Sequence, residues 1–285
     1  MDLSTGILVI GSLAWDTEGG RRRWRTKRLK DGGSVFCNVK VPIRYGRLSH
    51  KQKPGLGTYT MVFADSVGCR PGDAKVFPCS SAVSNFEDLW LEARWLWAAE
   101  VKKANKEPSD SVASDWGCVA LLRNPALQND PPEATLEAAL FKQWTTAVNN
   151  QKNQKCYFAD KDARLLTGEG TLKVDWSQFN VSGCSSLPDL LLATTNTPCL
   201  DNQGQTCFPS LNTIVSAWYN DVPNAPAEDR DPYVGYFWCN YHNGFRTFQD
   251  EDIKQGLNAL AGAVADPGKC IPPRSHRTQP VMAET

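Results

Sequence analysis

The sequence has no surplus of charge of either sign, and this narrows its possible partners. Its 285 residues include 31 Lys and Arg and 31 Asp and Glu, so the formal net charge is zero. A general nucleic-acid binder needs a basic surplus to neutralise phosphates. We therefore expect no nucleic-acid partner.

Long hydrophobic runs are also missing. No apolar stretch approaches the roughly 20 residues of a membrane-spanning helix. The first residues carry no basic region, and Gly11 and Ser12 interrupt the apolar run from 7 to 13, so the N-terminus does not resemble a signal peptide. We expect no membrane partner and a cytoplasmic location.

No Cys-x-x-Cys pair occurs among the ten cysteines. In a cytoplasmic protein these cysteines would be mostly reduced, and their scattered spacing agrees with that expectation. If the chain were secreted, the even number would permit disulfides.

One dense basic block, residues 21–30, stands out in the otherwise balanced chain. We expect it to form a mobile, solvated loop whose charge is balanced by acids elsewhere. Two alternatives remain open. The block could be an anion-binding arm with Trp24 available for stacking, or one of its arginines could reach the pocket beside Gly11.

Periodicity predicts a mixture of strands and helices. Strands are expected at 7–10, 34–41, 58–64, 75–79, 115–122, 171–176, 188–196 and 233–242. Helices are expected at 85–103, from about 133 to 149, near 210–218 and from about 247 to 264. We interpret this as an α+β protein with a mixed, partly closed β-sheet or small β-barrel and helices packed outside.

The chain is long enough for one large domain. We expect residues 1–150 to form the core and residues 151–266 to form an extension packed on it in the same globular unit. Residues 267–285 are rich in Pro, Ser and Thr, which predicts a disordered tail.

The first strand presents the most suggestive local pattern. Four branched apolar residues, 7–10, indicate a strand buried on both faces, and Gly11 then permits a tight turn. Ser12 adds a hydroxyl beside the freed backbone N–H groups. Such a turn could hold a carboxylate or phosphate, and it could equally be an ordinary turn after a buried strand.

Several short motifs occur in an order that resembles the gamma-glutamylcyclotransferase family. They are the strand ending in Gly-Ser-Leu at 11–13, Tyr-Gly-Arg-Leu-Ser at 45–49, Gly-Thr-Tyr-Thr at 57–60 and Trp-Gly-Cys-Val at 116–119. The resemblance covers the first half of the chain. It implies a small gamma-glutamyl amide as substrate and Gly11, Ser12, Leu13 and Tyr45 as substrate-binding residues.

Two positions depart from the family pattern. Ile10 stands where the family has Tyr, and no Leu-Asp-x-x-Glu segment follows the Trp-Gly strand. The resemblance implies one catalytic Glu, for which Glu137 is the first candidate and Glu133 the second. Glu92 and Glu100, on the preceding predicted helix, are reserves. Each of these carboxylates could instead be a solvated residue on a helix face.

The implied reaction needs one proton-transferring carboxylate. The substrate's α-amine attacks its own γ-carbonyl, and the carboxylate passes the proton to the leaving amine. Backbone N–H groups of the Gly-Ser turn would hold the substrate carboxylate or the developing oxyanion. No cofactor is implied.

Two polar groupings in the second half invite other interpretations. Cys199, Cys207, Cys239 and His242 could hold Zn²⁺, but their spacing matches no zinc signature, and a strand would place Cys239 and His242 on opposite faces. We expect no metal. Hydroxyls and amides at 194–197 and 210–213 could line a polar pocket, or serve ordinary turns and helix caps.

Two functions follow from these patterns. The first is a cyclotransferase-like enzyme acting on a small gamma-glutamyl amide. The alternative is a non-catalytic binding or interaction protein that uses the same pocket for an anionic ligand or a partner chain. A carboxylate placed beside Gly11 would discriminate between them. The oligomeric state stays open.

Overall fold

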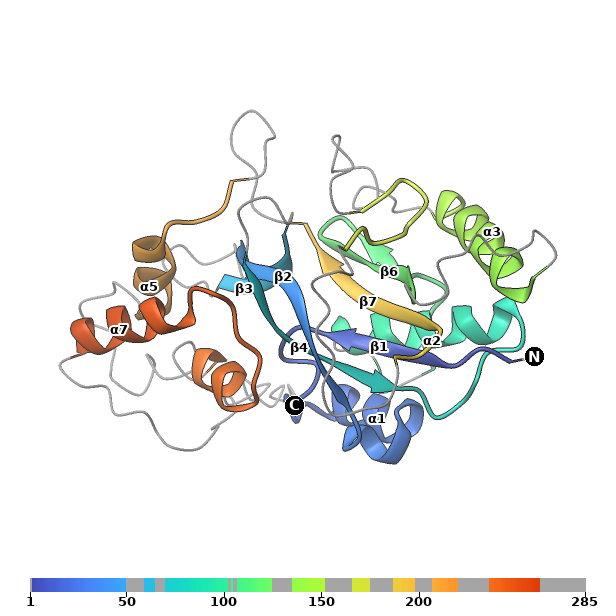
Figure 1. Cartoon of the computed structure of the whole chain (residues 1–285), viewed down its shortest axis with the longest axis horizontal. Coiled ribbons are helices and arrows are strands. Elements are labelled where there is room, and N and C mark those ends of the chain that lie inside the picture. The colour runs from blue at the N-terminus through green and yellow to red at the C-terminus, as the bar shows by residue number, and fades with distance from the viewer. Residues whose placement is uncertain are drawn as a thin grey trace, which may run out of the picture.

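The computed structural model describes residues 2–49, 59–64, 70–101, 104, 107–124, 135–151, 166–174, 187–197, 207–219 and 236–261 (Figure 1). Its elements are β1 (Thr5–Val9), α1 (Gly19–Arg28), the 3-10 helix η1 (Lys30–Gly33), β2 (Cys37–Leu48), β3 (Tyr59–Phe63), β4 (Pro71–Pro78), α2 (Phe86–Glu100), β5 (Ala113–Ser114), β6 (Gly117–Arg123), α3 (Leu136–Asn149), β7 (Leu190–Asn196), α5 (Leu211–Tyr219) and α7 (Asp250–Ala261). The predicted α+β class is confirmed.

The strands form one seven-stranded mixed sheet in the order β3-β2-β4-β1-β7-β6-β5. The pair β1 and β7 is parallel, and every other pair is antiparallel. The edge strands β3 and β5 lie at opposite ends of the order, and β5 spans only two residues, too short to close the sheet. The sheet is not closed into a barrel, so the predicted closure is wrong.

Strand directions define two edges of this sheet. Strands β1 and β2 are both antiparallel to β4, and β7 is parallel to β1. The three strands β1, β2 and β7 therefore end at the same edge, which we call the carboxyl edge. The opposite edge, where β1 begins, is the amino edge.

Helices cover the sheet in two groups (Figure 1). Helix α2 packs on β6 and β7, with α1 and α3 beside it, and α5 packs on α7 next to β3. The Asn85 side chain caps α2 by accepting a hydrogen bond from the Asp88 N–H at 3.0 Å. Below this cap, Leu89, Ala93 and Leu96 repeat at helical spacing and are fully buried.

The basic block is helical, so the predicted mobile loop is wrong. The Glu18 side chain caps α1 by accepting a hydrogen bond from the Arg21 N–H. The Trp24 side chain is fully buried and Arg21 is only 5% exposed. Burial of one helix face, together with the cap, stabilises a regular helix despite the density of like charges.

The aromatic segment predicted as a strand also differs. Residues 236–242 are helical, and residues 233–235 lie outside the described part. Rings four positions apart meet on this helix, with centroids 5.8 Å apart for Phe237 and Tyr241 and 5.9 Å apart for Trp238 and His242. Aromatic residues favour strands locally, but here tertiary packing selects the helix.

Strand β7 belongs to the predicted extension, yet it lies between β1 and β6 of the predicted core. Its register places Thr5 beside Leu190 on one side and Arg123 beside Leu190 on the other. Residues 151–266 therefore supply an interior strand of the sheet. The predicted tail, 267–285, lies outside the described residues.

Two further findings bear on the cellular setting. Cys37 and Cys239 are disulfide-bonded, so the expectation of reduced cysteines is wrong for these two. Cys79, Cys118 and Cys207 are not in disulfides. Every helix in the described ranges is too short or too polar to cross a membrane.

Candidate functional site

Residues 11–13, which we call the Gly11 turn, follow β1 directly at the carboxyl edge. The carbonyls of the turn are occupied, since Gly11 O accepts from Ala14 N–H and Ser12 O accepts from both Trp15 and Asp16 N–H. Within the described part of the chain, the N–H groups of residues 11–13 donate to no protein acceptor. Three backbone donors are thus left at the end of a buried strand.

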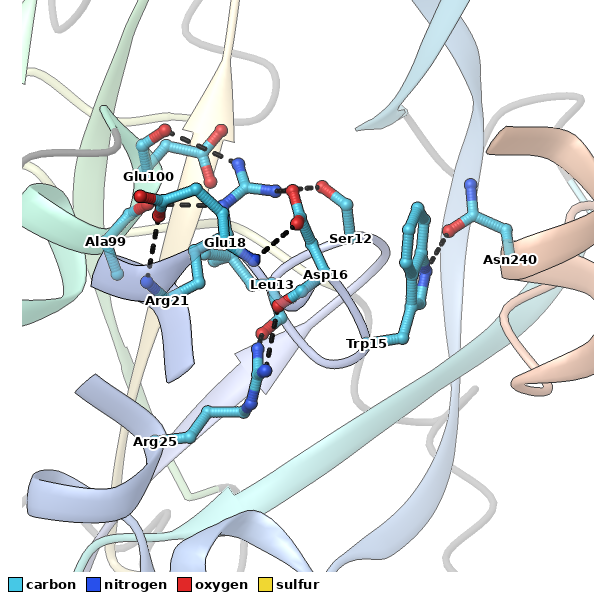
Figure 2. A network of polar contacts seen from close by, with 10 residues as sticks. All are labelled: Ser12, Leu13, Trp15, Asp16, Glu18, Arg21, Arg25, Ala99, Glu100 and Asn240. Carbon is cyan, nitrogen blue, oxygen red and sulfur yellow. Dashed lines mark hydrogen bonds and ion pairs between the residues drawn. The ribbon is translucent and has the colours of Figure 1, made fainter. Parts of the chain in front are cut away.

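Arg21 from α1 braces this turn (Figure 2). Its guanidinium donates to Ser12 Oγ and pairs with Asp16 Oδ2, each at 2.8 Å. It also donates to the Ala99 and Glu100 carbonyls at the end of α2, at 3.3 and 3.5 Å. These four acceptors are protein groups, so Arg21 ties the turn to α2 and positions Ser12.

A second arginine acts on the same loop. Arg25 donates to the Leu13 carbonyl at 2.6 Å and to the Asp16 carbonyl at 2.8 Å (Figure 2). Helix α1 therefore holds residues 12–16 from one side. Two arginines of the basic block thus contact the Gly11 turn, and the pocket predicted beside Gly11 stays a prediction.

Residues of the helix at 236–242 approach the turn from the other side. Asn240 Oδ1 accepts from Trp15 Nε1 at 2.8 Å, and the Trp15 and Tyr236 rings meet edge to face with centroids 5.5 Å apart. A side chain at Gly11 would place its Cβ 3.6 Å from both Asn240 Oδ1 and the Tyr236 hydroxyl. These two polar atoms therefore face the turn.

The Tyr236 hydroxyl is electrostatically coupled to the turn. Burial raises its pKa, while hydrogen bonds with Ser12 and Asn240 and the charge of Arg21 lower it in part. The charge of Glu100 raises the pKa further. Tyr236 thus stays protonated at neutral pH and can act as a hydrogen-bond donor.

Of the predicted acids that lie among the described residues, only Glu100 is shown at the carboxyl edge, at the end of α2 and beside Arg21 (Figure 2). Glu92 is ion-paired with Arg28. Burial raises the pKa of the Cys79 thiol, and the charge of Glu92 raises it further. The Cys79 N–H donates to the Thr5 carbonyl, so this group of residues lies at the amino edge. Burial raises the pKa of Glu92, and Arg28 lowers it in part.

The structure does not bring Glu137 to the Gly11 turn. Glu137 is 7% exposed and ion-paired with Arg123, whose strand register places it beside Leu190 and hence level with Thr5. Thr5 and Gly11 are six positions apart in the chain, which corresponds to about 20 Å at roughly 3.3 Å per extended residue. Glu133 lies outside the described residues.

Tyr45 is fully buried in β2, beyond the point where β4 pairs with that strand. Its ring meets Trp218 of α5 edge to face at 4.6 Å. Burial raises the pKa of Tyr45 well above its usual value, and the negative charges of Asp250 and of ionised Tyr236 raise it further. Tyr45 thus lies near Tyr236, on the side of the site formed by the C-terminal helices.

The remaining predicted groupings have structural roles. The Ser210 hydroxyl accepts from the Thr213 N–H at 3.2 Å, which confirms the helix-cap interpretation for that segment. Cys239 is disulfide-bonded, and His242 stacks on Trp238. Cys199 lies outside the described residues.

Sequence reasoning missed Tyr236, Asn240 and Trp15 as site residues. The first two fall in the segment interpreted as a strand, where period-two alternation gives no reason to pair them with Gly11. A helical interpretation places residues 236 and 240 on one face, one turn apart. That spacing was the available signal.

Comparisons with protein-family models, with curated proteins and with solved structures give no significant match. The resemblance to the gamma-glutamylcyclotransferase family therefore stays a prediction that these comparisons do not test.

Proposed function

We propose that the Gly11 turn binds the carboxylate of a small ligand. The observation that carries this proposal is the set of three backbone N–H groups, at residues 11–13, without protein acceptors at the end of a buried strand. Successive backbone N–H groups can complement a carboxylate, and the turn needs no reorganisation because Arg21 and Arg25 already hold it.

The arrangement favours a small molecule over a nucleic acid. Arg21 and Arg25 direct their donors at protein acceptors, and Arg23 and Lys27 lie over the Trp95 ring. The basic side chains of α1 therefore contact protein groups and hold the turn in place. The balanced charge of the whole chain supports the same partner class.

A second candidate function is cyclotransferase-like catalysis on a gamma-glutamyl amide. The specific observation in its favour is Glu100, whose backbone carbonyl accepts from Arg21 beside the Gly11 turn and whose charge raises the pKa of Tyr236. In this proposal Glu100 takes the proton from the attacking α-amine and passes it to the leaving amine. The turn N–H groups and the Tyr236 hydroxyl stabilise the oxyanion.

Binding is tested first, by titrating the ¹⁵N-labelled protein with gamma-glutamylalanine and with 5-oxoproline. We expect saturable chemical-shift changes at the Gly11, Ser12 and Leu13 amides. The matched control for 5-oxoproline is 2-pyrrolidinone, which keeps the ring and its amide but lacks the carboxylate. Equal binding of this control, or the absence of shifts at these amides, would contradict the proposal.

Catalysis is tested by release of 5-oxoproline from gamma-glutamyl dipeptides. We expect Glu100→Gln to lose about 10²–10⁴-fold in rate, and Glu137→Gln, about 20 Å away along the strands, to keep its rate. If only Glu137→Gln lost rate, Glu137 and not Glu100 would be the catalytic carboxylate. If the wild-type protein bound the ligand but released no 5-oxoproline, the protein would have the non-catalytic binding function.

A further inference from the structure

Lys75, in β4, places its amine between two aromatic rings. Its Nζ lies 3.9 Å from the centroid of the Phe36 ring and 5.4 Å from that of the Phe245 ring. Phe36 immediately precedes β2, and Phe245 follows the helix at 236–242. Phe245 is fully buried, whereas Lys75 and Phe36 are half-buried, so this cluster reaches the protein surface.

Among the described residues, no protein group accepts a hydrogen bond from this amine or forms an ion pair with it. On the two neighbouring strands, Val9 and Asn38 pair directly with Lys75 and therefore share its face of the sheet. Val9 is buried and apolar, and Asn38 carries no charge. An ammonium group has three N–H donors, and the described residues leave all three to water.

The charged groups beside Lys75 have other partners. Asp73 lies two residues earlier on the same face of β4 and is ion-paired with Lys40 of β2. The backbone of Arg246 bridges to that of Asp73, but its guanidinium lies over the Tyr241 ring at 4.0 Å. These contacts engage the carboxylate that could neutralise Lys75 and the cations that could hold an anionic ligand.

Burial and the aromatic rings act on this amine in opposite directions. The ring faces attract an ammonium group, by about 0.5–1 kcal/mol at exposed sites. Loss of hydration favours the neutral amine, and burial lowers the pKa of Lys75. The neutral form is therefore more populated than in a solvated lysine, and the neutral amine is the form that attacks a carbonyl carbon.

Gly244 leaves room beside the amine. A side chain there would place its Cβ 3.8 Å from Lys75 Cε and 3.9 Å from Lys75 Nζ. Apart from the residues adjacent to Gly244 in the chain, no other described atom lies within 4 Å of that position. The missing side chain therefore leaves space next to Nζ, on the side that neither ring covers with its face.

We propose that Lys75 forms a Schiff base with small, uncharged aldehydes. Its lone pair attacks the carbonyl carbon to form a C–N bond, and the carbonyl oxygen leaves as water with the two amine hydrogens. The two rings can contact an apolar aldehyde, whereas an anionic one would find Lys40 and Arg246 already engaged. This site lies beyond the proposed function and uses other residues than the Gly11 turn, so either proposal can fail alone.

The experiment traps the Schiff base on the folded protein. The full chain is treated at pH 7 with limiting propionaldehyde and with cyanoborohydride, which reduces the imine to a stable amine, and modification of each lysine is quantified by peptide mass spectrometry. The internal controls are Lys27, over the Trp95 ring at 5.5 Å, and Lys254, over the Tyr241 ring at 5.1 Å. We expect Lys75 to be modified several-fold faster than either control, and this preference should disappear in concentrated urea.

Variants test whether the surroundings of the amine cause its reactivity. In Gly244→Asn the new residue tolerates the left-handed backbone at this position, where φ is 74°. Its carbonyl oxygen can accept a hydrogen bond from the ammonium group and stabilise the charged form, so Lys75 should react no faster than Lys27. Phe36→Ala should have the same effect by hydrating the amine, and it serves as the test if Gly244→Asn does not fold. Equal or slower modification of Lys75 in the wild type, a preference that persists in urea, or an unchanged preference in the folded variants would each overturn the proposal.

Discussion

At the scale of single residues, burial and pairing decide the role of each charged side chain. Arg21, Glu137 and Asp250 are all buried, but only the first two have a charged partner. Buried charges with partners hold elements together, whereas burial of a carboxyl group without a charged partner favours its neutral form, so that its ionisation opposes folding. Asp250 is therefore the residue whose titration should be visible in the whole protein.

We predict that Asp250 makes the protein less stable as the pH rises. Its pKa is about 7 in the folded state against an ordinary 3.8, so the folded state holds a proton that the unfolded state has lost. Its contribution to the free energy of unfolding is therefore largest at low pH. Between about pH 4 and 7 this contribution decreases, by at most about 4 kcal/mol in all.

The measurement is urea denaturation of wild type and Asp250→Asn at pH 5, 6, 7 and 8. As the pH rises, the free energy of unfolding of the wild type should fall relative to that of the variant, because Asn cannot ionise. Parallel stability curves would show that Asp250 does not titrate there.

At the scale of elements, α1 links the end of β1 to the end of α2. Arg21 contacts residues of both elements, and its side chain replaces water as their hydrogen-bonding partner. A helix of ten residues with like charges three and four positions apart is marginal by itself, so its stability depends on these contacts. The Gly11 turn thus owes its geometry to a neighbouring helix.

We predict that Arg21→Met destabilises the protein by about 3 kcal/mol, because Asp16, Ser12 and two carbonyls lose their donor in a buried setting. Arg22→Met is the matched control, since Arg22 is exposed on the same helix and should change stability by less than about 0.5 kcal/mol. Both are measured by urea denaturation, and equal effects would show that the brace does not contribute.

At the scale of the whole molecule, β7 joins the two halves of the chain. It pairs with β1 over residues 190–193 and with β6 over residues 190–196. Without it, β1 and β6 would each expose an unpaired edge with a buried, apolar character on both faces. Cys37 and Cys239 are each disulfide-bonded, and disulfides are rare in cytoplasmic proteins.

We predict that a chain ending at residue 150 does not fold, since it lacks this interior strand. It should show no cooperative unfolding in urea and poor dispersion in its amide spectrum. A chain ending at residue 266, which removes only the predicted tail, is the control and should unfold cooperatively. Native-like dispersion in the shorter chain would show that residues 1–150 form an independent domain.

Local patterns in the sequence were sufficient for much of the secondary structure. The apolar run before Gly11, the capped amphipathic helix after Asn85 and the helix after Ser210 appear where predicted, because caps and hydrophobic periodicity act over a few residues. The balanced charge likewise follows from composition alone.

Tertiary structure alone decided which of these elements meet. Glu137 follows the Trp-Gly strand in sequence, but the antiparallel pairing of β6 with β7 sends that strand to the amino edge, away from Gly11. Tyr236 and Asn240 reach the turn because the segment is a helix, which its own residue preferences do not favour. Strand order, register and long-range burial set these positions, and they depend on contacts between residues far apart in the chain.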